Sequence, residues 1–191
     1  MLRTQALQAR SPRPDRPDGA EPPRIEIRPA GRPDAADIRD FISGLSVRTQ
    51  FLRFFASVAP PSTGLLRRLC GTDGSSDVVI ATRRGSVIGH AMAVDRTGGD
   101  GVRTSDIGLV VADRWQQLGV GSALLRSVVA RAAARGVGVL VMDVLPGNRQ
   151  VLAMIARRWP GARHKFSADS ITIRACLEAG GARDGGSASA A

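Results

Sequence analysis

The sequence has 191 residues, 43% of them hydrophobic, which is enough for one domain whose core needs neither a disulfide nor a metal. Its net charge of +10 comes from scattered arginines, and only 4% of its residues are aromatic, so it lacks the continuous basic and aromatic stripe of a nucleic-acid-binding surface. No apolar run approaches a membrane span or a secretory signal, and Cys70 and Cys176 lack metal-ligand spacing. These features predict a cytoplasmic protein with no nucleic-acid partner, no membrane partner and no metal site.

The two ends of the chain differ in composition from its centre. Residues 1–23 are rich in proline, arginine, aspartate and glycine, and cannot bury enough apolar surface to offset the entropy of ordering. Residues 179–191 consist mainly of glycine, serine and alanine. We therefore expect a disordered arm, a folded domain over 24–178 and a flexible tail.

The first half of the domain combines one strand, several helices and a group of strands. In chain order, the patterns predict a strand and three helices, at 25–28, 34–45, 46–56 and 65–70. Ser46 is a candidate N-cap of the second helix. Three strands then form a meander, with a hairpin turn at Arg83-Arg84-Gly85 between the first two, at 77–82, 86–94 and 102–111.

The second half alternates helices and strands. One apolar stripe predicts a helix that starts near Gly121 and ends at Gly136, and the apolar run 137–145 predicts a strand covered on both faces. A second stripe over 151–159 predicts another helix, before a last strand at 171–177. The fold class is therefore α/β, with a mixed sheet and helices in layers.

The segment from Asp106 to Ser122 passes from a strand, through a short loop, into a helix. Unpaired N–H groups at a helix start point in one direction and carry the positive end of the helix dipole. Because Gly119 and Gly121 have no Cβ, a phosphate can approach this backbone closely, and Ser122 adds a hydroxyl. The segment predicts an anion-binding site.

Two other interpretations of these glycines remain open. The segment has the pattern of an ordinary glycine-rich helix start. It also begins the dinucleotide-binding pattern G-x-G-x-x-G, with Asp143 at the end of a strand about 20 residues later. Against the dinucleotide site, Leu124 stands at the third glycine and several residues separate the strand from Gly119. A Walker loop is excluded because no Lys-Ser/Thr pair follows.

A third interpretation fits every position of the segment. Gln116-x-x-Gly119-x-Gly121, after Leu109-x-Val111, resembles the Q/R-x-x-G-x-G/A signature of the GNAT superfamily of N-acetyltransferases, and the strand order matches that family over 25–177. The resemblance implies a mostly antiparallel mixed sheet whose fourth and fifth strands splay apart around the cosubstrate acetyl-CoA. Asn148 matches a family asparagine that touches the cofactor, although by itself it is typical of an N-cap. The implied cofactor-binding residues are Leu109, Val110, Val111, Gln116, Gln117, Leu118, Gly119, Val120, Gly121, Ser122 and Asn148.

A narrower resemblance lies upstream of this motif. The segment 45–55 is similar to the L-S-x-x-S-x-x-x-R-F segment of bacterial Pat-type protein lysine acetyltransferases, except that Gln50 replaces the second serine and Phe51 shifts the aromatic position. It implies a protein lysine as the acceptor and an acyl-CoA synthetase as the protein substrate. The alternative is an amphipathic core helix with buried phenylalanines (Phe51, Phe54, Phe55) and arginines on its rim (Arg48, Arg53).

The resemblance also implies the chemistry: direct attack by an amine on the thioester, without an acyl-enzyme. The family usually places a catalytic glutamate on the fourth strand, where this chain has Asp106; the alternative is a solvated strand-end carboxylate. Because aspartate is one methylene shorter, we expect Asp106 to accept the amine proton through water. Many members protonate the thiolate with a tyrosine, which this chain lacks. His90 and His164 are candidate substitutes, although the alternating pattern around His90 is typical of a structural strand residue.

The leading hypothesis is an acetyl-CoA-dependent N-acetyltransferase that acts on a protein lysine. Acetylation of a small amine, such as an antibiotic or a polyamine, is the alternative within the same class. A non-catalytic acyl-CoA-binding GNAT module is the third hypothesis, because the chain lacks the tyrosine and has aspartate in place of glutamate. In each case we expect a monomer or a homodimer.

Overall fold

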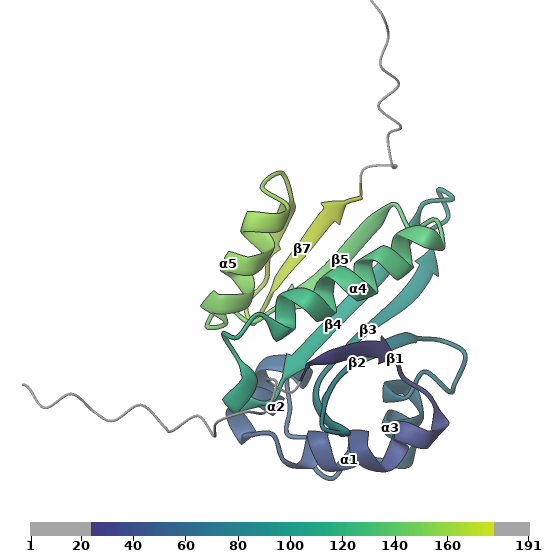
Figure 1. Ribbon diagram of the computed structural model, residues 1–191. Helices are drawn as coiled ribbons and strands as arrows, with labels where there is room; N and C mark the ends of the chain where they lie inside the picture. The colour runs from purple at the N-terminus through teal and green to yellow at the C-terminus, as the bar shows by residue number, and fades with distance from the viewer. Residues whose placement is uncertain (1–23, 178–191) are drawn as a thin grey trace, which may run out of the picture.

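The computed structural model describes residues 24–177, so the expected arm and the expected tail both lie outside the described residues. Within this range a seven-stranded sheet has the order β1-β2-β3-β4-β5-β7-β6 (Figure 1). The strands are β1 (Glu26–Pro29), β2 (Asp77–Arg83), β3 (Ser86–Thr97), β4 (Arg103–Val111), β5 (Val139–Val144), β6 (Arg163–Phe166) and β7 (Ile171–Cys176). The α-helices are α1 (Ala35–Ser43), α2 (Val47–Phe54), α3 (Thr63–Leu69), α4 (Val120–Ala134) and α5 (Arg149–Arg158).

Helices cover both faces of the sheet, which confirms the expected layered α/β fold. In β2, Val79 and Ala81 belong to the core cluster of α4, whereas Val78 and Ile80 belong to the cluster of α1 and α3. Successive side chains of a strand point to opposite faces, so a strand buried on both faces is apolar throughout. Figure 1 shows α4 lying along the sheet and α5 beside β7, with α1 and α3 grouped at the other end.

Short-range signals located most boundaries within a few residues. Arg84 and Gly85 both have positive φ, 50° and 81°, and form the tight turn expected between β2 and β3. Gly136, with φ 80°, follows the last turn of α4 as expected. Strand β6 was not expected: all four of its residues are exposed, so no apolar alternation marks it, and it pairs only with β7 at the sheet edge.

The central feature of the sheet is the pair of strands β4 and β5. They run parallel and pair only at Thr104–Val139, Ser105–Leu140 and Asp106–Val141, whereas the other strand pairs are antiparallel. Beyond Asp106, β4 continues along β3 to Val111, and β5 continues along β7 to Val144. The two strands therefore separate in the middle of the sheet, which confirms the splayed arrangement that the family resemblance implied.

Candidate functional site

The separation of β4 and β5 leaves backbone groups of β4 without a neighbouring strand. The N–H of Ala112 donates to the carbonyl of Ile88 on the β3 side, and the N–H of Gly138 donates to the carbonyl of Arg103 on the β5 side. Peptide groups of a strand alternate in direction, so Leu109 and Val111 point toward the gap, and Val110 points toward β3. In the gap, the side-chain amide of Gln116 donates to the carbonyl of Val111. The N–H and carbonyl of Leu109 remain available to a ligand with an extended amide chain.

The loop before α4 presents a row of backbone N–H groups at one end of this gap. Gln117 has φ 61° and Gly119 has φ 85°, so left-handed residues alternate with right-handed or extended ones. This alternation turns successive N–H groups toward one concavity, the arrangement found in anion-binding backbone nests. The first helical hydrogen bond joins the N–H of Ala123 to the carbonyl of Gly119, which leaves the preceding N–H groups without a helical acceptor.

Glycine occupies positions 119 and 121 of the motif for different structural reasons. Gly119 is the N-cap of α4, and its positive φ favours glycine although nothing lies within 4 Å of the place that a Cβ would occupy there. At Gly121 a Cβ would make ordinary contact, at 3.7 Å, with the side chains of Leu109 and Val111 on β4. Gly121 therefore permits close packing of the helix on the strand, and alanine fits the same space.

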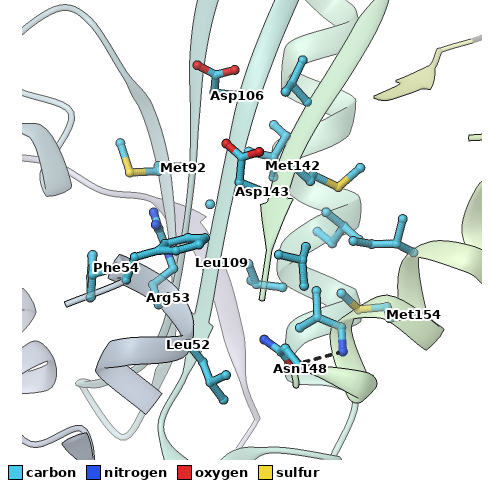
Figure 2. Close-up of a pocket in the computed structure, with 18 of the residues that line it drawn as sticks. Leu52, Arg53, Phe54, Met92, Asp106, Leu109, Met142, Asp143, Asn148 and Met154 are labelled. Carbon is cyan, nitrogen blue, oxygen red and sulfur yellow. Dashed lines mark hydrogen bonds between the residues drawn. The ribbon is translucent and has the colours of Figure 1, made fainter. Parts of the chain in front are cut away.

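Two adjoining cavities occupy the gap and continue along it. The larger, about 1050 Å³, extends from Leu109 and Val111 to the loop at Gln116–Ser122 and to the start of α5. Three of its lining arginines accompany one lining aspartate, a balance that complements a polyphosphate: Arg48, Arg149, Arg157 and Asp113. The smaller cavity, about 330 Å³, reaches the point where β4 and β5 separate (Figure 2).

Asn148 lines both cavities, in agreement with both interpretations of its role. Its side-chain oxygen accepts a hydrogen bond from the N–H of Val151 at 3.4 Å, as an N-cap of α5 does (Figure 2). The side-chain amide nitrogen is a separate donor group and is not used by the cap.

Asp106 lies where the strands begin to separate and lines the smaller cavity together with Asp143 (Figure 2). Its carboxylate accepts a hydrogen bond from Nε of Arg96 at 2.7 Å, and its side chain is 41% exposed. Asp143 accepts from the hydroxyl of Thr172 at 2.6 Å. Asp106 is therefore held in place and accessible to water at the far end of the gap from the anion-binding loop.

Helix α2 faces the cavities in a way that the core-helix interpretation did not predict. That interpretation was wrong about which side chains are buried: Phe51 is 51% exposed and Phe55 39% exposed, whereas Nε of Arg53 is buried. Ser46 is the N-cap as predicted, since its hydroxyl accepts from the N–H of Thr49. Gln50 is buried and donates to the carbonyl of Leu45, so the residue that replaces serine in the motif stabilises the helix end.

A hydrogen-bond network that no sequence pattern indicated connects α2 to the cofactor loop. Asp113, which begins the turn before the loop, accepts from the hydroxyls of Ser46 at 2.7 Å and Thr49 at 2.8 Å. Gln116 also donates to the hydroxyl of Thr49 at 3.3 Å. Burial raises the pKa of Asp113, but the hydrogen bonds from Ser46 and Thr49 outweigh it and hold the pKa below its usual value. The charged form of Asp113 therefore links α2 to the loop.

The two histidines that were candidate proton donors, His90 and His164, lie in different environments. His90 is fully buried, its Nε2 lies 2.8 Å from the carbonyl of Leu69, and burial lowers its pKa to about 4. This confirms the structural alternative for His90, whereas His164 is exposed on β6. Residues 24–177 contain no cluster of His, Cys, Asp and Glu that could hold a metal ion. No helix in this range is long and apolar enough to cross a membrane.

Comparison with known proteins identifies the class of protein that this geometry defines. Residues 46–158 match the model of the acetyltransferase (GNAT) family. The structure resembles the GNAT domain of PAT from S. lividans, with 25% identity, a TM-score of 0.71, and coverage of 80% of this chain and 90% of that chain. A search of curated proteins found no match. The chain belongs to the GNAT family of acetyltransferases, and acetyl-CoA is the cosubstrate of that family.

Other solved structures share the fold at lower identity. An acetyltransferase of the GNAT family from Streptococcus pneumoniae has 16% identity and a TM-score of 0.66, with coverage of 81% of this chain and 100% of that chain. The putative acetyltransferase yncA from Salmonella typhimurium, solved with acetyl-CoA, has 18% identity, a TM-score of 0.59, and coverage of 81% and 94%.

Proposed function

We propose that this protein transfers an acetyl group from acetyl-CoA to a primary amine, specifically a lysine side chain of a protein. The observation that carries the proposal is the gap between β4 and β5. It has the anion-binding loop at one end and Asp106 at the other, and the two cavities between them share lining residues such as Leu109 and Asn148. A thioester whose diphosphate lies at the loop would have its acyl end near Asp106.

The cofactor assignments follow from the free backbone groups of the gap. We assign the diphosphate to the N–H groups from Gln117 to Ser122 and the amide chain of the cofactor to the peptides of Leu109 and Val111. The peptide of Val110 pairs with β3, so Val110 lines the cavity without a free backbone donor for the cofactor. The side-chain amide of Gln116 donates to the carbonyl of Val111 and thereby holds the loop, without contacting the cofactor in this assignment. The side-chain amide nitrogen of Asn148 can donate to the cofactor, since only its oxygen is used by the N-cap.

The reaction needs a proton acceptor for the substrate amine. A lysine-like amine with a pKa of ~10.4 is only about one part in 2,500 neutral at pH 7. Acetyl-CoA supplies an activated carbonyl carbon. The ammonium first loses one proton through water to Asp106, and the neutral nitrogen then attacks the carbonyl carbon. The C–N bond forms as the C–S bond breaks, the thiolate leaves with the electron pair, and the second proton that the nitrogen loses passes to that thiolate. A thiolate with a thiol-like pKa of ~8.5 is a tolerable leaving group, which fits a chain without tyrosine.

Thiol release from acetyl-CoA tests the catalytic role of Asp106. We expect Asp106→Asn to lower kcat/KM by about 10²-fold, the typical contribution of a general base. Asp143→Asn is the matched control, because that carboxylate lines the same cavity and bonds only to Thr172 among the described residues. Unchanged kcat/KM for Asp106→Asn between pH 6 and 9 would remove Asp106 from the mechanism.

The identity of the acceptor is tested with the same assay. Phe51 and Phe55 are exposed on α2, and Phe55 lines the smaller cavity, so an apolar surface borders the catalytic end of the gap. Such a border favours a protein acceptor over a small polar amine. Thiol release with folded proteins and not with polyamines supports the proposal, release with small amines indicates the alternative, and binding of acetyl-CoA without turnover indicates a non-catalytic module.

A further inference from the structure

Arg53, in the last turn of α2, has its guanidinium at the catalytic end of the gap. It lines both cavities, and its guanidinium lies over Gly108 of β4, where an added Cβ would collide with it. Figure 2 shows Arg53 beside β4 between Met92 and Leu52, with Asp106 further along the same strand. Asp106 and Gly108 are two residues apart, so they share one face of β4 at about 7 Å along the strand. A substrate whose amine reaches Asp106 therefore has its neighbouring atoms beside Arg53.

The guanidinium of Arg53 lacks an anionic partner within the described chain. Its Nε is buried with no hydrogen-bond partner, and its one contact with an aromatic ring is with Phe54, at 4.9 Å from the centroid. The two carboxylates that line the same cavity are engaged elsewhere: Asp106 with Arg96 and Asp143 with Thr172.

Burial lowers the pKa of Arg53 to about 10, so the group is still charged at neutral pH. A partly desolvated charge is unfavourable unless an opposite charge accompanies it. Arg135 illustrates the usual solution, since its guanidinium is paired with Asp95 and Asp77. An anionic group of a ligand would supply what Arg53 lacks.

We propose that Arg53 binds a carboxylate of the substrate at the reaction centre. This inference rests on the proposed acyl transfer and adds a substrate class to it. The planar fork of a guanidinium matches a carboxylate in two parallel hydrogen bonds. The rest of the smaller cavity is lined by apolar side chains such as Met92, Ile107 and Met154, which suit a short hydrocarbon link to that carboxylate. The phosphates of the cofactor have their own site at the loop before α4.

Two substrates can carry such a carboxylate, and paired substrates distinguish them. On the donor side, succinyl-CoA is compared with acetyl-CoA; on the acceptor side, a lysine peptide with glutamate beside the lysine is compared with the same peptide carrying glutamine there. We expect the wild-type protein to favour the carboxylate-bearing member of one pair in kcat/KM by about 10- to 100-fold, the range of a hydrogen bond to a charged group. The pair that shows the preference identifies the source.

Three variants connect that preference to Arg53. Arg53→Met removes the charge at similar length and should abolish the preference, whereas Arg53→Lys keeps the charge without the fork and should retain part of it. Gly108→Ala should displace the guanidinium and weaken the preference while α2 keeps its sequence. Arg126→Met is the matched control, because Arg126 is exposed on α4 away from both cavities.

Calorimetry separates failure of this inference from failure of the proposed function. If no amine is acylated, Arg53-dependent binding of succinyl-CoA over acetyl-CoA, or of the glutamate peptide over the glutamine peptide in the presence of CoA, still supports the carboxylate site. The inference is overturned if wild-type protein shows no preference in either pair by either measurement. A preference that Arg53→Met and Gly108→Ala both leave intact overturns it equally.

Discussion

Gly119 and Gly121 occupy equivalent places in the sequence motif, but the structure predicts that alanine has different effects at the two positions. In Gly119→Ala an L-residue must hold φ near 85°, and no nearby atom prevents the side chain from fitting. The left-handed conformation costs a non-glycine residue roughly 1–2 kcal/mol. In Gly121→Ala the new methyl makes contacts of ordinary length with Leu109 and Val111, inside a helix that favours alanine by up to about 1 kcal/mol.

The strain in Gly119→Ala must appear in one of two measurements. If the loop keeps its conformation, the free energy of unfolding falls by about 1–2 kcal/mol, which lowers Tm by roughly 2–8 °C in a domain of this size. If the loop relaxes instead, the cofactor must restore it on binding, and the Kd for acetyl-CoA rises by up to about 5- to 30-fold.

The assay therefore combines thermal unfolding with calorimetry of acetyl-CoA on both variants. We expect Gly119→Ala to lose stability, affinity or some of each, and Gly121→Ala to lose neither. Equal losses in the two variants would show that Gly121 serves close approach of the phosphate, as the sequence alone implied. No loss in Gly119→Ala would refute the argument from its backbone conformation.

Two further predictions concern stability, and a third concerns the affinity for acetyl-CoA. Burial lowers the pKa of His90 to about 4 in the folded protein, whereas the value in the unfolded chain is 6.5. The contribution of His90 to the free energy of unfolding is therefore complete above pH 6.5 and is lost as the pH falls. The free energy of unfolding should be about 2 kcal/mol lower at pH 5 than at pH 8, and His90→Gln should remove most of that difference. Arg135→Met should lower the free energy of unfolding by about 1–3 kcal/mol in denaturant titrations, since it leaves Asp95 and Asp77 without this partner. Asp113→Asn should weaken the hydrogen bonds to α2 and raise the Kd for acetyl-CoA about 3- to 10-fold, which calorimetry measures. If Asp113 and Thr49 act together, the same substitution should have little effect on this Kd in a protein that already carries Thr49→Val.

Sequence patterns predicted the parts of this fold whose causes are local. The turn at Arg84-Gly85 has residues with positive φ, and helix ends are marked by their caps, as at Ser46 and Gly136. The signature from Gln116 to Gly121 is likewise local, since it covers one loop and the first residues of α4. The run 137–145 was expected to be covered on both faces, but in β5 only alternate residues are buried and Asp143 is exposed. Strand β6 escaped prediction because its four side chains are exposed and its pairing with β7 depends on distant chain.

The residues missed at the site depend on tertiary contacts. Asp113 lies 67 residues from Ser46 and 64 from Thr49, so no local pattern connects them. The burial of Arg53 depends on a missing side chain at Gly108, on another element. A pattern of apolar positions in α2 indicates an amphipathic helix but does not indicate which neighbour covers each side, and the phenylalanines were therefore assigned to the wrong environment.

Helix α2 connects the two ends of the proposed site. At its start, Thr49 and the capping Ser46 bond to Asp113 beside the cofactor loop, and at its end Arg53 lies over β4. Its eight residues span about 12 Å, and the hydrogen bonds along the helix couple its two ends. A change of the loop on cofactor binding must therefore either break the bonds to Asp113 or move the guanidinium with it. If the helix moves, loss of the Asp113 bonds should change the carboxylate preference as well as the affinity for acetyl-CoA, although Asp113 lies outside the smaller cavity.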